Sequence, residues 1–299
     1  MQNIYETLNK ANNQISKTGY NRLPKEEYAK QKKAEREHLY KLAENQCRKI
    51  ASDSKAYLSY LNLASRIDYT VTNILLVMAQ KPEASVLKDN KHWKDDKYYV
   101  KKGEKGIKII MPVGEYQRND GSIATNYAVK NVFDVSQLDK SVKIVKNSYS
   151  IKEILDGILY YAPVEFHKLD RLDKDVIYSP NSKAIFYKEG LTPTQLISGL
   201  LIQTCYAEFN QQYTDKNLAN ESIICDSAGY ILCRKYGIEV SDTTFADKIN
   251  DYFSNMEINE IKDKLSTVKS LTGSVSERME KGIYKSQIQK QNQRKGDVR

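Results

Sequence analysis

The sequence predicts an α+β protein, in which an N-terminal module of helices and a β-hairpin precedes a mainly helical second domain with a small sheet. Three observations support this class. Residues 74–79 are apolar nearly all round, which is typical of a buried helix. Residues 107–110 are a β-branched run that follows a glycine-containing turn, which is typical of a strand. Much later in the chain, Thr192, Pro193 and Gln195 form the start signature of a helix.

The N-terminal module is predicted to cover residues 1–140. A short helix and loop (1–23) are followed by a charged helix with a thin apolar stripe (25–50) and a second helix (55–67). Thr70 or Thr72 caps the buried helix, and Lys81-Pro82 ends it, because a residue before proline avoids the helical region. Strand 107–110 is expected to stop at Pro112 and to pair across a long, mobile loop with a returning strand (127–133).

A polar linker (141–150) is predicted to lead into the second domain, residues 151–272. Its expected elements are a helix (151–160), two short strands (176–178 and 184–187), the helix that begins after Thr192, and two further helices (221–236 and 245–253). Gly237 is expected to stop the helix before it. The final segment, 273–299, is rich in Lys, Arg and Gln, and its composition predicts a disordered basic tail.

Composition bounds the function. A formal net charge of +9 over 299 residues favours a polyanionic partner. The chain has 22 Tyr against one Trp and six Phe, which suggests rings that lie half in water, where they can stack on bases. No apolar run is long enough to span a membrane, and no signal peptide is recognisable. The four cysteines show no pairing pattern, so we expect reduced thiols in a cytoplasmic protein.

The segment between the buried helix and the strand at 107 interleaves lysines with aromatic rings. Such a mixture suits a sugar-phosphate backbone with exposed bases. The alternative is a solvated hairpin whose single tryptophan fills a small core, and for Trp93 itself we favour the core. Tyr98 and Tyr99 would point in opposite directions on a strand, so at most one of them would face a nucleic acid. The candidate contacts in this segment are Trp93, Lys94, Lys97, Tyr98, Tyr99, Lys101, Lys102 and Lys105.

The order and spacing of Asn73, an apolar helix, Gln80, Pro82, Trp93 and the string V-K-K-G-E-K-G-I (100–107) resemble the N-terminal domain of ArdC-type antirestriction proteins. The same module occurs in LtrC-like proteins of bacterial conjugative elements. The resemblance implies a single-stranded DNA-binding domain and adds Asn73 and Gln80 to the candidate contacts. The residues by themselves show only compatibility with that role.

The second domain has the layout of a zincin-like metallopeptidase, two strands followed by a capped helix and a later helix with an acid. In many ArdC- and LtrC-like proteins the first of these helices carries H-E-x-x-H. Here Ile202 and Tyr206 fall at the histidine positions, Gln203 at the glutamate, and Asp226 at the third ligand. Zinc hydrolysis needs imidazoles to hold the ion and a carboxylate to activate its water. The sequence therefore predicts a degenerate peptidase domain with no metal and no cofactor.

None of the three histidines has another ligand residue at metal-site spacing. We therefore expect a non-enzymatic, single-stranded DNA-binding protein of a mobile genetic element with an antirestriction or anti-defence role. A second hypothesis is an interaction protein that inhibits a host defence enzyme through its inactive peptidase-like domain. A third is a hydrolase that uses residues without a recognisable pattern.

Overall fold

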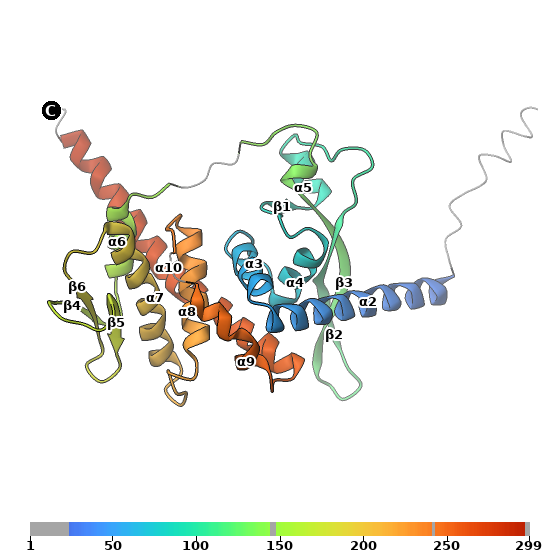
Figure 1. Ribbon diagram of the computed structural model, residues 1–299. Helices are drawn as coiled ribbons and strands as arrows, with labels where there is room; N and C mark the ends of the chain where they lie inside the picture. Colours follow the sequence, from blue (N-terminus) through green and yellow to red (C-terminus); the bar gives the residue numbers. More distant parts are fainter. Residues whose placement is uncertain (1–23, 144–147, 241–242, 297–299) are drawn as a thin grey trace, which may run out of the picture. The chain divides into compact units, whose positions relative to one another are not determined.

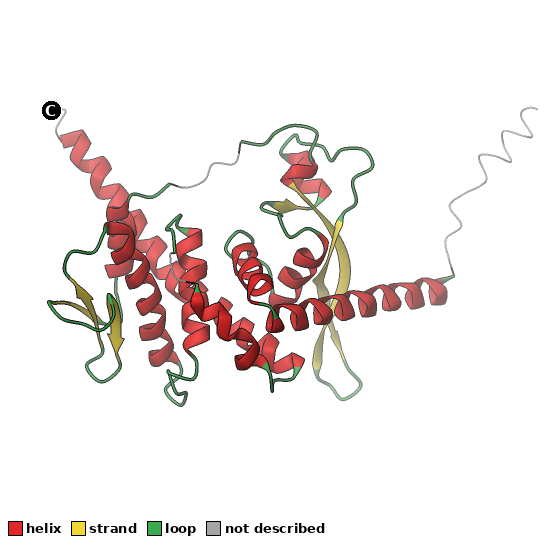
Figure 2. Cartoon of the chain, in the orientation of Figure 1, coloured by secondary structure: helices red, strands yellow, loops and turns green. Residues whose placement is uncertain are grey.

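The structure, a computed structural model, describes residues 24–143, 148–240 and 243–296. The predictions for residues 1–23, for part of the linker and for residues 297–299 fall outside this range. The chain divides into two units, Met1–His38 and Leu39–Arg299. The predicted α+β class is confirmed, because the elements are mostly helices together with two three-stranded sheets (Figures 1 and 2).

The long charged helix α2 (Lys25–Ser52) forms as predicted. In its first part, which belongs to the first unit, Lys32 and Glu35 form an ion pair of 2.8 Å one turn apart. Ion pairs three or four residues apart stabilise a helix by only about 0.2–0.5 kcal/mol each. In its second part Ala43, Cys47 and Ile50 are buried, so the helix is held there by packing.

Helices α3 (Ser54–Ala64) and α4 (Val71–Gln80) follow. The Asp53 side chain caps α3 by accepting from the backbone N–H of Ala56. Of the two predicted caps for α4, Thr70 is the one used, because its hydroxyl accepts from the backbone N–H of Asn73. As predicted, α4 is buried along nearly its whole length and ends before Pro82.

The first sheet has the order β1-β3-β2 and contains β1 (Leu87–Lys88), β2 (Ile107–Gln117) and β3 (Ile123–Asp134). The prediction that Pro112 stops the strand is wrong. Strand β2 lies at the edge of the sheet and shifts register between Pro112 and Gly114, and edges and bulges are where a strand tolerates proline. The prediction of a long mobile loop is also wrong, since Arg118 N–H donates to the Ser122 carbonyl at 2.8 Å and closes a short turn.

The second sheet, with order β4-β6-β5, lies against α7. Its strands are β4 (Glu165–Leu169), β5 (Val176–Ser179) and β6 (Ala184–Lys188), of which β4 pairs in parallel with β6 and was not predicted. The predicted helices are present as α6 (Ile151–Leu159), α7 (Pro193–Gln212) and α8 (Ser222–Lys235), followed by the 3-10 turn η2 (Thr244–Lys248) and α9 (Ile249–Phe253). Thr192 and Gln195 form the predicted capping box, and Gly237 has the positive φ of 73° that ends a helix.

The predicted disordered tail is wrong, because helix α10 runs from Ile258 to Gly296. The composition of the segment concealed a helical spacing of apolar residues. Val275, Met279 and Ile283 recur every four residues and are completely or almost completely buried. At Gly282 the helix passes so close to α6 that an added Cβ would lie 3.0 Å from the Asp156 carbonyl oxygen. Burial of this stripe, and not local composition, therefore orders the segment.

One hydrophobic cluster runs through the unit that begins at Leu39. It includes all four cysteines, which are buried free thiols as predicted. Burial raises the pKa of Cys47 to about 11 and that of Cys233 to about 12, so both thiols stay protonated at neutral pH. In the part of the chain that the structure describes, no helix is both long and apolar enough to cross a membrane.

Candidate functional site

Trp93 anchors the lysine-rich segment to the protein. It lies on the short helix α5 (Asn90–Asp95), which Asp89 caps by accepting from the backbone N–H of His92. The indole is 1% exposed, and its Nε1 donates to the Phe133 carbonyl of β3 at 2.9 Å. The Tyr98 ring packs edge-on against it, with 6.2 Å between centroids. The core alternative for Trp93 is therefore confirmed, and this ring is not available to stack on a base.

The backbone beyond α5 is held in a fixed course by the turn that follows β3. The N–H of Lys101 donates to the Gln137 carbonyl at 2.9 Å, and the N–H of Asp139 donates to the Tyr99 carbonyl at 2.8 Å. The Gln137 amide donates to the Lys105 carbonyl at 2.9 Å. Gly103 has φ +91°, a conformation that L side chains rarely adopt. The turn that carries the lysines is thus pinned at both of its ends.

Asp134 holds together the segments after β3 that contact the lysine-rich turn. It caps the 3-10 turn η1 (Val135–Gln137), and its carboxylate accepts from the backbone N–H groups of Ser85 at 2.7 Å and Ser136 at 2.9 Å. Burial alone would raise the pKa of this carboxyl group, but the hydrogen bonds outweigh it and lower the pKa. The carboxylate therefore remains ionised at neutral pH and ties β1, β3 and η1 together.

The lysines of the segment are exposed around this pinned turn. Lys101 donates from Nζ to the Ser136 carbonyl at 3.2 Å, so its charge lies against the protein surface. Tyr99 is 50% exposed, whereas Tyr98 is half buried against Trp93, so Tyr99 is the more accessible of the two rings. Four further lysines form no ion pair with any residue that the structure describes: Lys94, Lys97, Lys102 and Lys105.

Asn73 and Gln80, which the resemblance adds to the candidate DNA contacts, both bind the free edge of β2. The Asn73 amide accepts from the Ile110 N–H at 2.9 Å and donates to the Ile110 carbonyl at 2.8 Å. The Gln80 amide does the same with Lys108, at 2.9 Å for both bonds. Each amide thus replaces a neighbouring strand, and these two side chains hold α4 on the sheet.

The residues predicted to occupy the peptidase motif positions lie where α7 and α8 cross. An added Cβ at Gly229 would lie 2.7 Å from the Cα of Ile202, so the helices are in close contact there. The Tyr206 hydroxyl donates to Asp226 Oδ1 at 2.9 Å. Burial, and then the charge of Asp226, raise the pKa of Tyr206 well above its usual value. The Gln203 side chain accepts from the Tyr178 N–H of β5 at 2.8 Å.

Comparison with known proteins agrees with this architecture. Residues 30–148 match the family described as the N-terminal domain of the anti-restriction factor ArdC. This part of the chain belongs to the ArdC N-terminal domain family.

The metal-free crystal structure of the antirestriction ArdC protein from plasmid R388 matches 80% of this chain and 98% of its own length, with a TM-score of 0.57 and 14% identity. The Mn(II)-bound structure of the same protein matches 71% of this chain and 85% of its own, with a TM-score of 0.50 and 13% identity. These likenesses show that the two proteins share a fold. No curated protein matches the chain.

The chain does not offer a set of side chains that fits a metal ion at the α7–α8 crossing. Ile202 has no donor atom, Gln203 is occupied by the β5 backbone, and Asp226 is the one carboxylate at these positions. Oδ1 of that carboxylate already accepts from Tyr206. Among the described residues, no group of three or more His, Cys, Asp or Glu could hold an ion. A neutral amide at Gln203 also cannot accept the proton that a general base must take up.

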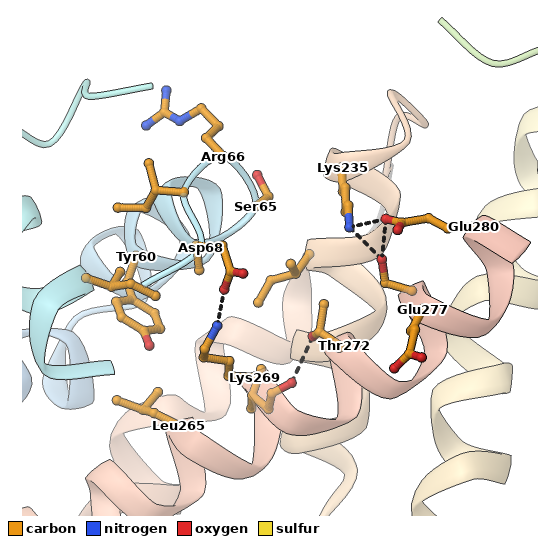
Figure 3. Close-up of a pocket in the computed structure, with 17 residues that line it drawn as sticks. Tyr60, Ser65, Arg66, Asp68, Lys235, Leu265, Lys269, Thr272, Glu277 and Glu280 are labelled. Carbon is orange, nitrogen blue, oxygen red and sulfur yellow. Dashed lines mark hydrogen bonds and ion pairs between the residues drawn. The ribbon is translucent and has the colours of Figure 1, made fainter. Parts of the chain in front are cut away.

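A cavity of about 350 Å³ lies elsewhere in the ArdC-type fold, between the end of α3, α8 and α10. Figure 3 shows Lys269 of α10 reaching across it to Asp68. On its other side Lys235 contacts Ser276 and pairs with Glu280 at 2.8 Å. The charges that line the cavity are thus largely matched within it, and they do not converge on a catalytic arrangement.

Proposed function

We propose that this ArdC-type chain binds single-stranded DNA without catalysing a reaction, and that it serves a bacterial mobile element in antirestriction. The observation that carries the proposal is the pinned turn with its exposed lysines and Tyr99, within the part of the chain that matches the ArdC N-terminal domain. Cations on a fixed backbone beside an exposed ring are the combination that single-strand-binding proteins use. The net charge of +9 adds long-range attraction for phosphate.

A salt titration of single-strand binding tests this proposal. Replacing Lys97, Lys102 and Lys105 together by Ala should weaken binding of a 15-mer of thymidine and reduce the slope of log K against log salt by about two units, at about 0.7 per phosphate contact. A matched control removes the same charge from three lysines that already pair with carboxylates, namely Lys152, Lys168 and Lys281.

The control variant should keep the slope of the wild type within about half a unit. Equal losses in both variants would mean that net charge alone attracts DNA and would remove the pinned turn from the binding site. A wild type that binds neither single- nor double-stranded oligonucleotides at low salt would overturn the proposed function itself.

A second candidate function, inhibition of a host defence protein through the peptidase-like half, is supported by exposed apolar side chains on α6, α10 and the residues beside them. Leu159, Tyr161 and Tyr284 are all exposed, and Tyr161 also has the strained positive φ of 44°. Replacing Tyr161 and Tyr284 by Ser should then abolish anti-defence activity in cells while the affinity for oligonucleotides stays unchanged. Loss of anti-defence activity only in the lysine variant would favour the DNA-binding function.

A further inference from the structure

A groove of about 720 Å³ opens beside the first turn of α4, away from the lysine-rich turn. Three tyrosines from separate parts of the chain line it: Tyr40 of α2, Tyr69 just before α4, and Tyr127 of β3. Met111 and Pro112 of β2 add apolar surface. Tyr40 and Tyr127 are exposed and Tyr69 is half buried, so the rings form a surface that solvent and ligands can reach.

The groove is built by the contact between α4 and the edge of β2. The Asn73 amide holds Ile110 against α4, and the residues of β2 from Met111 onward are exposed. Pro112 pairs in register with Tyr127 on β3, which places both on the same stretch of the hairpin. Beyond Pro112 the outer part of that hairpin is exposed on both strands except at Ala124. The groove with its three rings thus lies where the β2–β3 hairpin, which Figure 1 shows as a long arm, becomes exposed.

We propose that this groove is the base-stacking subsite for single-stranded DNA, an inference that rests on the proposed function. Tyrosine rings offer a flat apolar face while their hydroxyl groups remain in water, and every base has a face that can stack on them. The volume lies within the range of about 300–1,000 Å³ found for ligand sites.

Strand β2 connects the groove to the lysine-rich turn. Lys105 lies two residues before β2 begins, and Pro112 is seven residues further along the chain. At about 3.3 Å per residue, this separation is at most about 23 Å. Single-strand sites commonly cover about 4–16 nucleotides per module, so one strand can contact phosphate-binding lysines and the groove together.

The ion pair between Lys269 and Asp68 lies at the border of the groove and also lines the cavity of Figure 3. The Asp68 side chain is 94% exposed, so solvent screens the pair and little is lost when it opens. A phosphate can then replace Asp68 as the partner of Lys269. Asp68 is therefore expected to oppose DNA binding, and Lys269 to favour it.

A peptide added to the edge of β2 is the main alternative occupant. Such an addition needs unpaired N–H and C=O groups on the strand. The outer groups of Lys108 and Ile110 are already bonded to Gln80 and Asn73, and Pro112 has no N–H to give. The edge of β2 that borders the groove is thus closed to strand addition, whereas stacking needs only the ring faces.

Substitution of Tyr127 tests the proposal. Tyr127→Ala should weaken binding of the thymidine 15-mer about 5- to 150-fold, which corresponds to the stacking energy of one base, whereas Tyr127→Phe should stay within about two-fold. The matched control is Tyr116→Ala, on the other strand of the same arm. Tyr116 is 53% exposed against 42% for Tyr127, and it does not line the groove. Thermal melting of each variant checks that the fold is retained.

Two charge variants give effects of opposite sign. Lys269→Ala should weaken binding and lower the salt slope by about 0.7, while Asp68→Asn should tighten binding. If the wild type binds DNA with the lysine-dependent slope but Tyr127→Ala behaves like Tyr116→Ala, the groove is not the stacking site, although the proposed function stands. If the wild type does not bind DNA, the proposed function fails and the groove assignment fails with it.

Discussion

Replacement of Asn73 by leucine tests the inference that α4 is fastened to β2 by side-chain amides. Leucine has nearly the shape of asparagine but can neither donate nor accept a hydrogen bond. Asn73 is 1% exposed, so no water can replace the amide once it is removed. The N–H and C=O of Ile110 would then remain buried without partners.

The expected cost follows from the two lost bonds, of 2.8 and 2.9 Å. A buried polar group that loses its partner costs about 1–3 kcal/mol, so Asn73→Leu should lower the free energy of unfolding by about 2–4 kcal/mol after partial relaxation. Gln80→Leu removes the same kind of contact to Lys108, but Gln80 is exposed and water can take its place. Gln80→Leu should therefore lower the free energy of unfolding by only about 0.5–1.5 kcal/mol.

Urea unfolding at pH 7 of the wild type and both variants measures these differences. A third variant, Asn73→Asp, should show a pH dependence of its stability that a loss of packing alone would not produce. Its carboxylate would face the Ile110 carbonyl in a buried site, so its pKa in the folded state should lie above that in the unfolded state. Its stability relative to the wild type should then rise as the pH falls through the folded-state pKa, because the protonated acid can donate to Ile110.

Two results would refute this reasoning. One is an Asn73→Leu variant whose stability lies within about 0.5 kcal/mol of the wild type. The other is an Asn73→Asp variant whose difference from the wild type does not change between pH 7 and pH 4. Either result would mean that packing of the apolar residues of α4, and not the amide bonds, holds the helix on the sheet.

Four further predictions follow from the fold. Gly282→Ala should destabilise the protein by about 1–3 kcal/mol in urea unfolding, because the added Cβ would lie 2.5 Å from Cβ of Tyr160. Gly273→Ala on the same helix is the control: its Cβ would meet nothing within 4 Å, so this variant should be more stable than the wild type by up to about 1 kcal/mol. Equal effects of the two substitutions would mean that α10 does not pack on α6. Trp93→Ala should lower the free energy of unfolding by about 3–5 kcal/mol and lower the melting temperature. An unchanged melting temperature would mean that the indole does not contribute to the core. The Ser150 hydroxyl and N–H, together with Lys290, lower the pKa of Glu153 from 4.5 to about 2. The wild type should therefore lose stability relative to Glu153→Gln as the pH falls from 4.5 towards 2. Acid unfolding curves that run parallel for the two proteins would contradict this prediction. Purified protein should contain well under one zinc or manganese ion per chain by elemental analysis and should melt unchanged in a chelator; one tightly held ion that is lost together with stability would overturn the non-enzymatic proposal.

Local chemistry in the sequence determined much of the chain. The cap at Thr192, the stop at Gly237 and the buried run of α4 depend on residues within a few positions of one another, and their predictions are confirmed. The burial of Trp93, favoured from the sequence, is confirmed as well. The absence of imidazoles at the motif positions is likewise visible in the residue types alone, because no packing can supply a missing ligand atom.

The tertiary structure decided the features whose partners lie far away in the chain. The burial of Asn73 and the bonds of Asn73 and Gln80 to β2 become visible only when β2, about thirty residues later, is placed beside α4. Pro112 looks like a strand end until β2 is seen to be an edge strand. The tail looks disordered until its apolar stripe meets α6. In each case the deciding energy comes from burying or pairing a group against a distant segment, which local propensity does not record.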